Sequence, residues 1–127
     1  MSCAKLQKLG YKVYVARNDA FMCEDASFAL SYGCCLEEFV PDYIIENNQH
    51  IISFDDLKIN ILHVPGHTKG GLAYIIGNNI FSGDTLFYNG HGRTDLPGGN
   101  FKEILMSIEL LKTYIKKGYT LFCGHDY

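Results

Sequence analysis

Two features that would point to membranes or nucleic acid are missing from this 127-residue sequence. No apolar run approaches the roughly 18 to 20 residues that span a bilayer, and the opening residues, Met1 to Lys5, precede no apolar signal core. Basic residues are not in excess, because the net charge is −3 and only Lys116 and Lys117 are adjacent, whereas nucleic acid attracts a basic patch. We therefore expect a cytoplasmic protein with no membrane and no nucleic-acid partner.

Paired cysteine motifs are also missing. The five cysteines include no C-x-x-C pair and lie at Cys3, Cys23, Cys34, Cys35 and Cys123. An odd, scattered set predicts neither a disulfide framework nor a structural zinc ribbon, so we expect reduced thiols. The adjacent Cys34 and Cys35 are either reactive or small buried hydrophobic residues, and we favour the second interpretation.

Apolar residues are plentiful enough for one packed core, at 47% hydrophobic and 13% aromatic content. In the first third of the chain, their spacing predicts a helix over 4–9, a strand over 11–15 and one or two short helices over 18–32. Two further strands are expected over 43–48 and 50–54, separated by a polar turn.

The second part of the chain has stronger patterns. Alternation predicts a strand over 57–61, and the continuous apolar run 72–76 predicts a strand covered on both faces. The intervening Gly77-Asn78-Asn79 favours a hairpin between 72–76 and a strand over 80–82. Strands of both kinds indicate an α/β fold, with helices outside a sheet.

A long helix is expected next, beginning after Asn100 and ending at Gly118. Asn100 is a favourable cap, Glu103 completes a capping box, and apolar residues recur at helical spacing. They are Phe101, Ile104, Leu105, Ile108, Leu111 and Ile115. A strand over 119–123 follows.

Three candidate metal ligands, His67, Asp84 and His125, each follow one of these strands. Imidazole and carboxylate suit a divalent metal that activates water, and a glycine precedes each candidate. The alternative is ordinary: a single histidine after a Pro-Gly turn is usually a surface residue, and Gly-Asp is usually a turn. No His-x-His or Asp-His pair precedes residue 63, so spacing alone leaves both interpretations open.

Four segments together resemble the metallo-β-lactamase superfamily, and within it the glyoxalase II-like (hydroxyacylglutathione hydrolase-like) hydrolases. They are 63–68 (His-Val-Pro-Gly-His-Thr), 83–87 (Gly-Asp-Thr-Leu-Phe), 92–99 (Gly-Arg-Thr-Asp-Leu-Pro-Gly-Gly) and 123–127 (Cys-Gly-His-Asp-Tyr). The resemblance implies an αββα sandwich with a metal site at one edge of its two sheets. Because the superfamily's Thr-His-x-His-x-Asp-His signature is missing, we expect 1–127 to be a single, partial domain, roughly the C-terminal half of the fold.

The resemblance also implies roles for individual residues. His67 would bind a first metal, Asp84 would bridge two metals and be the catalytic carboxylate, and His125 would bind the second metal. Arg93 and Tyr127 would lie on the substrate side. The implied cofactor is one or two divalent metals, zinc foremost, with iron or manganese as the other choices.

Three histidines receive no metal role. We expect His63 to be structural or to contact a metal ligand rather than the metal, and His50 and His91 to be ordinary polar residues.

The implied activity is thioester hydrolysis, in which a metal-bound hydroxide attacks an S-acyl glutathione. Two alternatives stay open. The first is a mononuclear iron enzyme of the persulfide dioxygenase type, favoured by the segment 92–95 and the thiol-rich chain. The second is an incomplete, inactive fragment or interaction module, since half a sandwich would expose an apolar sheet face and self-associate.

Overall fold

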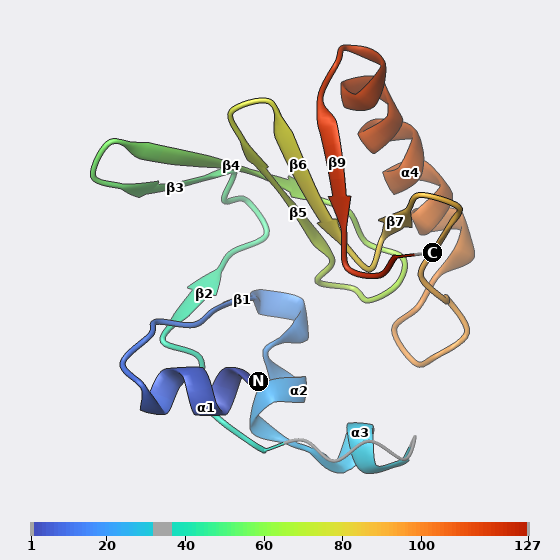
Figure 1. The fold of residues 1–127 in the computed structure, drawn as a ribbon. Coiled ribbons are helices and arrows are strands. Elements are labelled where there is room, and N and C mark those ends of the chain that lie inside the picture. Colours follow the sequence, from blue (N-terminus) through green and yellow to red (C-terminus); the bar gives the residue numbers. More distant parts are fainter. Residues whose placement is uncertain (1, 32–36, 127) are drawn as a thin grey trace. The chain divides into compact units, whose positions relative to one another are not determined.

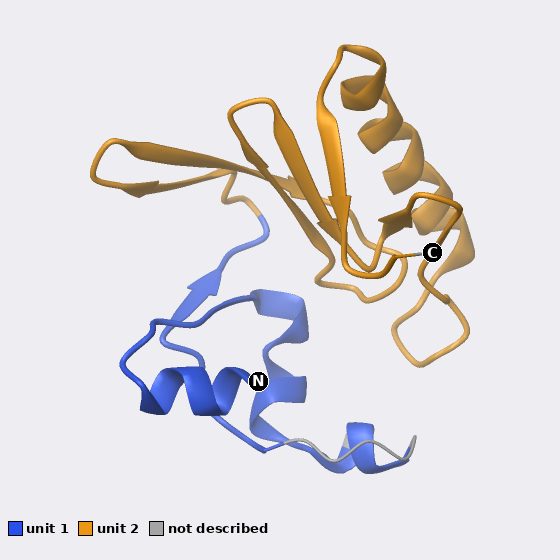
Figure 2. Cartoon of the chain, in the orientation of Figure 1, with its two compact units in different colours: residues 1–47 blue, residues 48–127 orange. Residues whose placement is uncertain are grey.

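The computed structural model describes residues 2–31 and 37–126, with the side chain of residue 28 left out. Two compact units, Met1–Asn47 and Asn48–Tyr127, are distinguished by their internal contacts (Figure 2), and each is described by itself. That residues 1–127 form a single domain stays a prediction. Cys34, Cys35 and Tyr127 lie outside the described residues.

The first unit is built from short elements around small buried residues. Helix α1 (Cys3–Lys8) is followed by β1 (Tyr14–Ala16), a 3-10 turn η1 (Arg17–Asp19), α2 (Phe21–Glu24), α3 (Ser27–Ser31) and β2 (Tyr43–Ile45). β1 and β2 pair in parallel. The buried hydrophobic residues here are Ala4, Ala16, Ala20, Ala26 and Ile45. The helix at 4–9 and the short helices after residue 17 are therefore confirmed.

The expected strand over 11–15 is shorter than predicted, and it begins only at Tyr14. The reason lies in Asp42. Its carboxylate accepts a hydrogen bond from the Val13 backbone N–H at 2.8 Å, while the Val13 carbonyl accepts from the N–H groups of Asp42 and Tyr43. These contacts close a loop at Val13, so regular pairing starts one residue later.

The second unit is a five-stranded sheet in the order β3-β4-β5-β6-β9 (Figure 1). Its strands are β3 (Ile51–Phe54), β4 (Leu57–His63), β5 (Leu72–Ile76), β6 (Asn79–Gly83) and β9 (Thr120–Cys123). Neighbours pair antiparallel except β6 and β9, which run parallel. The predicted strands and the β5–β6 hairpin are confirmed.

One long helix, α4 (Phe101–Lys116), covers one face of this sheet (Figure 1). The Asn100 side chain accepts a hydrogen bond from the Glu103 N–H at 2.9 Å, as the cap predicted. The core between helix and sheet consists of Val64, Ala73, Ile75, Ile80, Leu86, Ile104, Ile108 and Leu111. Burial of these apolar side chains is the main stabilising contribution in this unit.

Two details of the packing differ from the prediction. Phe101 and Leu105 belong to the predicted apolar face, but they are 58% and 45% exposed, because they lie at the margin of the stripe that Ile104 centres. In β5, only Ala73 and Ile75 are buried against α4, and the alternate residues are half-buried. Within residues 48–126 the sheet therefore has one helix-covered face rather than two.

On the other sheet face, Phe81 and Phe122 stack with ring centroids 5.2 Å apart and stay 39% and 44% exposed. A small hairpin, β7 (Leu86–Phe87) and β8 (Gly90–His91), follows β6 and was not predicted. Among the described residues, no helix has the length and apolar character to cross a membrane.

Candidate functional site

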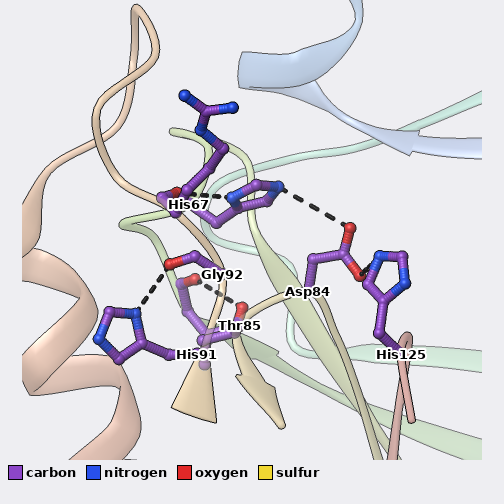
Figure 3. Close-up of polar contacts among 8 residues, drawn as sticks. His67, Asp84, Thr85, His91, Gly92 and His125 are labelled. Atoms are coloured by element: carbon purple, nitrogen blue, oxygen red, sulfur yellow. Dashed lines mark hydrogen bonds and ion pairs between the residues drawn. The ribbon is translucent and has the colours of Figure 1, made fainter. Parts of the chain in front are cut away.

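The three candidate ligands meet at one end of the sheet, where β4, β6 and β9 stop (Figure 3). Asp84 lies between the two histidines. The His67 Nε2 atom is 3.8 Å from Asp84 Oδ2, and the His125 Nε2 atom is 3.3 Å from Asp84 Oδ1. The side chains are partly open to solvent, at 27% for His67, 41% for Asp84 and 50% for His125.

The loop that carries His67 is fastened to α4. The Ser107 hydroxyl donates a hydrogen bond to the Pro65 carbonyl at 2.7 Å, and the Asn100 N–H donates to the Gly66 carbonyl at 2.7 Å. Gly66 has a φ of +139°, and a Cβ at this position would overlap the backbone of Ile104. The Pro-Gly sequence before His67 therefore serves two purposes, since it turns the chain and lets the loop touch the helix.

The His67 ring is oriented by a residue far along the chain. Its Nδ1 atom lies 2.7 Å from the Arg93 carbonyl oxygen. Because a carbonyl only accepts, Nδ1 carries the hydrogen, and the lone pair of the neutral ring is on Nε2, which faces Asp84. Gly92 gives the ring its space, since a Cβ there would lie 2.9 Å from it. Metal-binding histidines usually donate their second nitrogen in this way.

Asp84 and His125 are joined by the ends of their own strands. Gly83 turns the chain with a φ of +55°, and its carbonyl accepts a hydrogen bond from the Gly124 N–H at 2.7 Å. A side chain at Gly124 would collide with Asp84 Oδ1. The His125 ring contacts Phe87 edge to face, with centroids 5.4 Å apart. Close packing thus explains the glycines at 66 and 124 without reference to a metal.

The donor atoms suit a metal in type but not in number. Each histidine faces a different oxygen of Asp84, which gives two half-sites of one imidazole and one carboxylate oxygen. Among the described residues, no group of three or more His, Cys, Asp or Glu side chains is arranged to hold a metal ion. Zinc usually takes about four ligands, so each half-site supplies roughly half of a coordination shell.

The candidate ligands line a cleft of about 450 Å³. Its walls are His67, Asp84, Phe87, Asn89, Gly90, His91, Gly92, Arg93 and His125. His91, which we expected to be an ordinary polar residue, is among them. The sequence did contain a usable signal, because Asn89 and Gly90 are turn residues directly after Leu86-Phe87 and could have predicted the hairpin that presents it.

Arg93 lines the cleft, and Asp95 engages its guanidinium. The Nε and Nη2 atoms donate to the two carboxylate oxygens at 2.7 and 2.8 Å. This bidentate contact lowers the pKa of Asp95 to about 2. Arg93 therefore makes two separate contacts, because its carbonyl fixes His67 while its side chain is held by Asp95.

His63 is not among the residues that line the cleft. Its Nε2 atom donates to the Gln49 carbonyl at 2.8 Å, and its ring meets His50 edge on with centroids 5.4 Å apart. These contacts agree with the structural role that we expected for His63.

A family model described as "Metallo-beta-lactamase superfamily" matches residues 7–125. The chain belongs to this superfamily. The fold class is likewise confirmed as a partial α/β metallo-beta-lactamase domain, because the chain covers about 60% of full-length solved members. A protein solved in a di-iron-bound form, TTHA1623, is 28% identical, with a TM-score of 0.77 over 96% of this chain and 61% of that one.

Two curated members are similar in sequence. Hydroxyacylglutathione hydrolase GloC of Haemophilus influenzae is 33% identical over 92 residues, which are 71% of this chain and 43% of the relative. The Bacillus subtilis protein named "Probable polyketide biosynthesis zinc-dependent hydrolase PksB" is 31% identical over 81 residues, or 64% of this chain and 36% of that protein. The chain therefore spans less than half the length of these two relatives, and superfamily members bind zinc or iron.

Proposed function

We propose that this protein is a metal-dependent thioesterase that acts on glutathione thioesters. The observation that carries the proposal is the position of His67, Asp84 and His125 in one cleft, with the His67 lone pair directed at Asp84 by the Arg93 carbonyl. The similarity to a hydroxyacylglutathione hydrolase supports the substrate class. Oriented imidazole beside carboxylate in an open cleft is the arrangement that hydrolytic metals need.

The residues that would hold the metal follow from the two half-sites. His67 Nε2 with Asp84 Oδ2 forms one, and His125 Nε2 with Asp84 Oδ1 forms the other. Zinc or iron bound there supplies Lewis acidity, which polarises a thioester carbonyl and makes water a better nucleophile. Asp84 takes part in both half-sites, because each of its carboxylate oxygens faces one imidazole.

The remaining cleft residues position the substrate. Phe87 gives the wall an apolar surface beside His125, suitable for an acyl chain. Arg93 lines the cleft, and a carboxylate of the glutathione part would compete with Asp95 for its guanidinium. A bidentate pair is directional, so an incoming carboxylate must match its geometry to replace it.

The test is thioester turnover by the 127-residue chain supplied in turn with zinc, iron and manganese. We expect hydrolysis of S-lactoylglutathione, measured as the release of free thiol. The Asp84→Ala variant should lose this activity. Absence of turnover with all three metals, while a full-length superfamily thioesterase is active under the same conditions, would refute the proposal. Oxygen uptake with glutathione persulfide in place of thioester hydrolysis would instead favour an iron dioxygenase.

A further inference from the structure

A third histidine of the cleft, His91, has no place in the half-sites. His91 lies on β8, the second strand of the hairpin that follows Asp84, and it pairs with Leu86 of β7. It lines the same cleft as His67 and His125. In Figure 3 its ring lies on the other side of Gly92 from Asp84, apart from the two candidate metal ligands.

The contact of the His91 ring with the backbone fixes the tautomer of its neutral form. The Nδ1 atom is 2.8 Å from the Gly92 carbonyl oxygen. Since the carbonyl can only accept, Nδ1 carries the hydrogen, and the Nε2 of the neutral ring is a hydrogen-bond acceptor. The ring also contacts Phe101 at the start of α4, with centroids 6.2 Å apart. Backbone and helix together limit how the imidazole can turn.

The surroundings show what this acceptor can recognise. Within the described part of the chain, the Gly92 carbonyl and the Phe101 ring are the partners of His91, and no carboxylate or other imidazole contacts it. The nearest charged wall residue in sequence, Arg93, is paired with Asp95. In this tautomer the stretch of wall offers a hydrogen-bond acceptor, which matches an N–H donor better than an anion.

We propose that His91 is a specificity-determining residue whose Nε2 accepts a hydrogen bond from an amide N–H of the thiol part of the substrate. The inference rests on the proposed function for the identity of that thiol, because glutathione is a peptide with amide N–H groups. An acyl thioester without such a group makes no use of this contact. His91 thus distinguishes peptide thiols from simple thiols, while His67, Asp84 and His125 serve the reacting end.

Binding of S-methylglutathione, which has no thioester to hydrolyse, tests this contact without requiring activity. We expect His91→Ala to raise the dissociation constant about fivefold, the value of one hydrogen bond at an exposed site. His91→Gln, which keeps an acceptor oxygen at the end of its side chain, should stay within about twofold of the wild type. The matched control is His50→Ala, an exposed histidine that does not line the cleft, with no expected change.

A modified ligand provides the second arm. S-methylglutathione methylated at both amide nitrogens should bind the wild type about fivefold more weakly, and His91→Ala should not weaken it further. In NMR spectra, the wild-type His91 ring signals should shift only with the unmethylated ligand. The proposal is overturned if His91→Ala binds both ligands as the wild type does, if it weakens both equally, or if His91→Gln fails like alanine.

The two proposals fail separately in this design. If S-methylglutathione binds with the expected dependence on His91 but no thioester is hydrolysed, the hydrolase proposal is wrong and the His91 contact stands. If thioesters are hydrolysed but S-methylglutathione does not bind, or binds without regard to His91, the specificity proposal is wrong. Thermal unfolding of each variant, run beside the wild type, shows that a change in affinity is not a change in folding.

Discussion

The two imidazoles that flank Asp84 are held by different means. His67 is on a loop that α4 fastens through Asn100 and Ser107, and the Arg93 carbonyl fixes its ring. His125 follows the end of a strand, contacts Phe87, and is 50% exposed against 27% for His67. Preorganised side chains lose less conformational freedom when they bind a ligand. The His67 side chain is therefore preorganised for a ligand, whereas the His125 side chain is positioned mainly by its strand.

Removal of Asp84 should abolish the difference between the His67 half-site and the His125 half-site, because both depend on its carboxylate. We expect Asp84→Ala to weaken zinc binding by more than about 100-fold, since loss of an outer partner alone costs about 10- to 100-fold. Calorimetric zinc titration measures this effect. Asp56→Ala, in the exposed β3–β4 turn, is the matched control. Equal zinc affinity in Asp84→Ala and wild type would contradict the assignment.

A substitution at Gly66 can break the attachment of the His67 loop to α4. A Cβ there would overlap Ile104, and the backbone has a positive φ, so we expect Gly66→Ala to lower the free energy of unfolding by about 3 kcal/mol. Gly118→Ala also places alanine at a positive φ, of +100°, but in open space, and should cost about 1 kcal/mol. Urea denaturation of both variants isolates the close approach. Equal losses of unfolding free energy in the two variants would show that the contact with α4 is unimportant.

Substitution of His67 and of His125 should lower the zinc affinity by different amounts. His67→Ala and His125→Ala should each weaken zinc binding, by roughly 10- to 100-fold, with the larger loss at the preorganised His67. Arg93→Ala tests how His67 is oriented. It removes the guanidinium but keeps the carbonyl, so zinc affinity should change less than about threefold. A larger loss of zinc affinity in His125→Ala than in His67→Ala would mean that His125, and not His67, is the preorganised ligand.

The smallest effect concerns the pH dependence of the Arg93–Asp95 pair. Because Arg93 lowers the pKa of Asp95 from 3.8 to about 2, the pair is formed above the ordinary value and is lost as the pH falls through about 2. A carboxyl-carbon NMR titration should show this midpoint, and Arg93→Ala should return it towards 3.8. An unshifted Asp95 in the wild type would mean that Arg93 is not paired in solution.

Local patterns in the sequence predicted much of the fold. The alternation in β4, the turn residues after Ile76 and the cap at Asn100 act over a few residues, so they could be identified without the structure. The order of these strands also indicated that Asp84 and His125 would follow strand ends. Family resemblance then supplied the fold class, which the comparison with solved members confirmed.

The parts that sequence could not give depend on distant contacts. The orientation of His67 comes from the carbonyl of Arg93, 26 residues away. Any residue at position 93 would offer the same carbonyl oxygen if the backbone followed the same path, so the residue type gives no signal. Val13 left its expected strand because of Asp42. The metal roles of His67, Asp84 and His125 stay predictions, since the structure shows their convergence but not a complete shell among the described residues.

The most direct test of the central claim is a crystal structure of this chain grown with zinc and analysed by anomalous scattering. The account predicts zinc within about 2.2 Å of Asp84 and of at least one of His67 Nε2 and His125 Nε2, with ligand distances typical of zinc. Zinc bound elsewhere, such as at His50 and His63, or an empty cleft at saturating zinc, would contradict it.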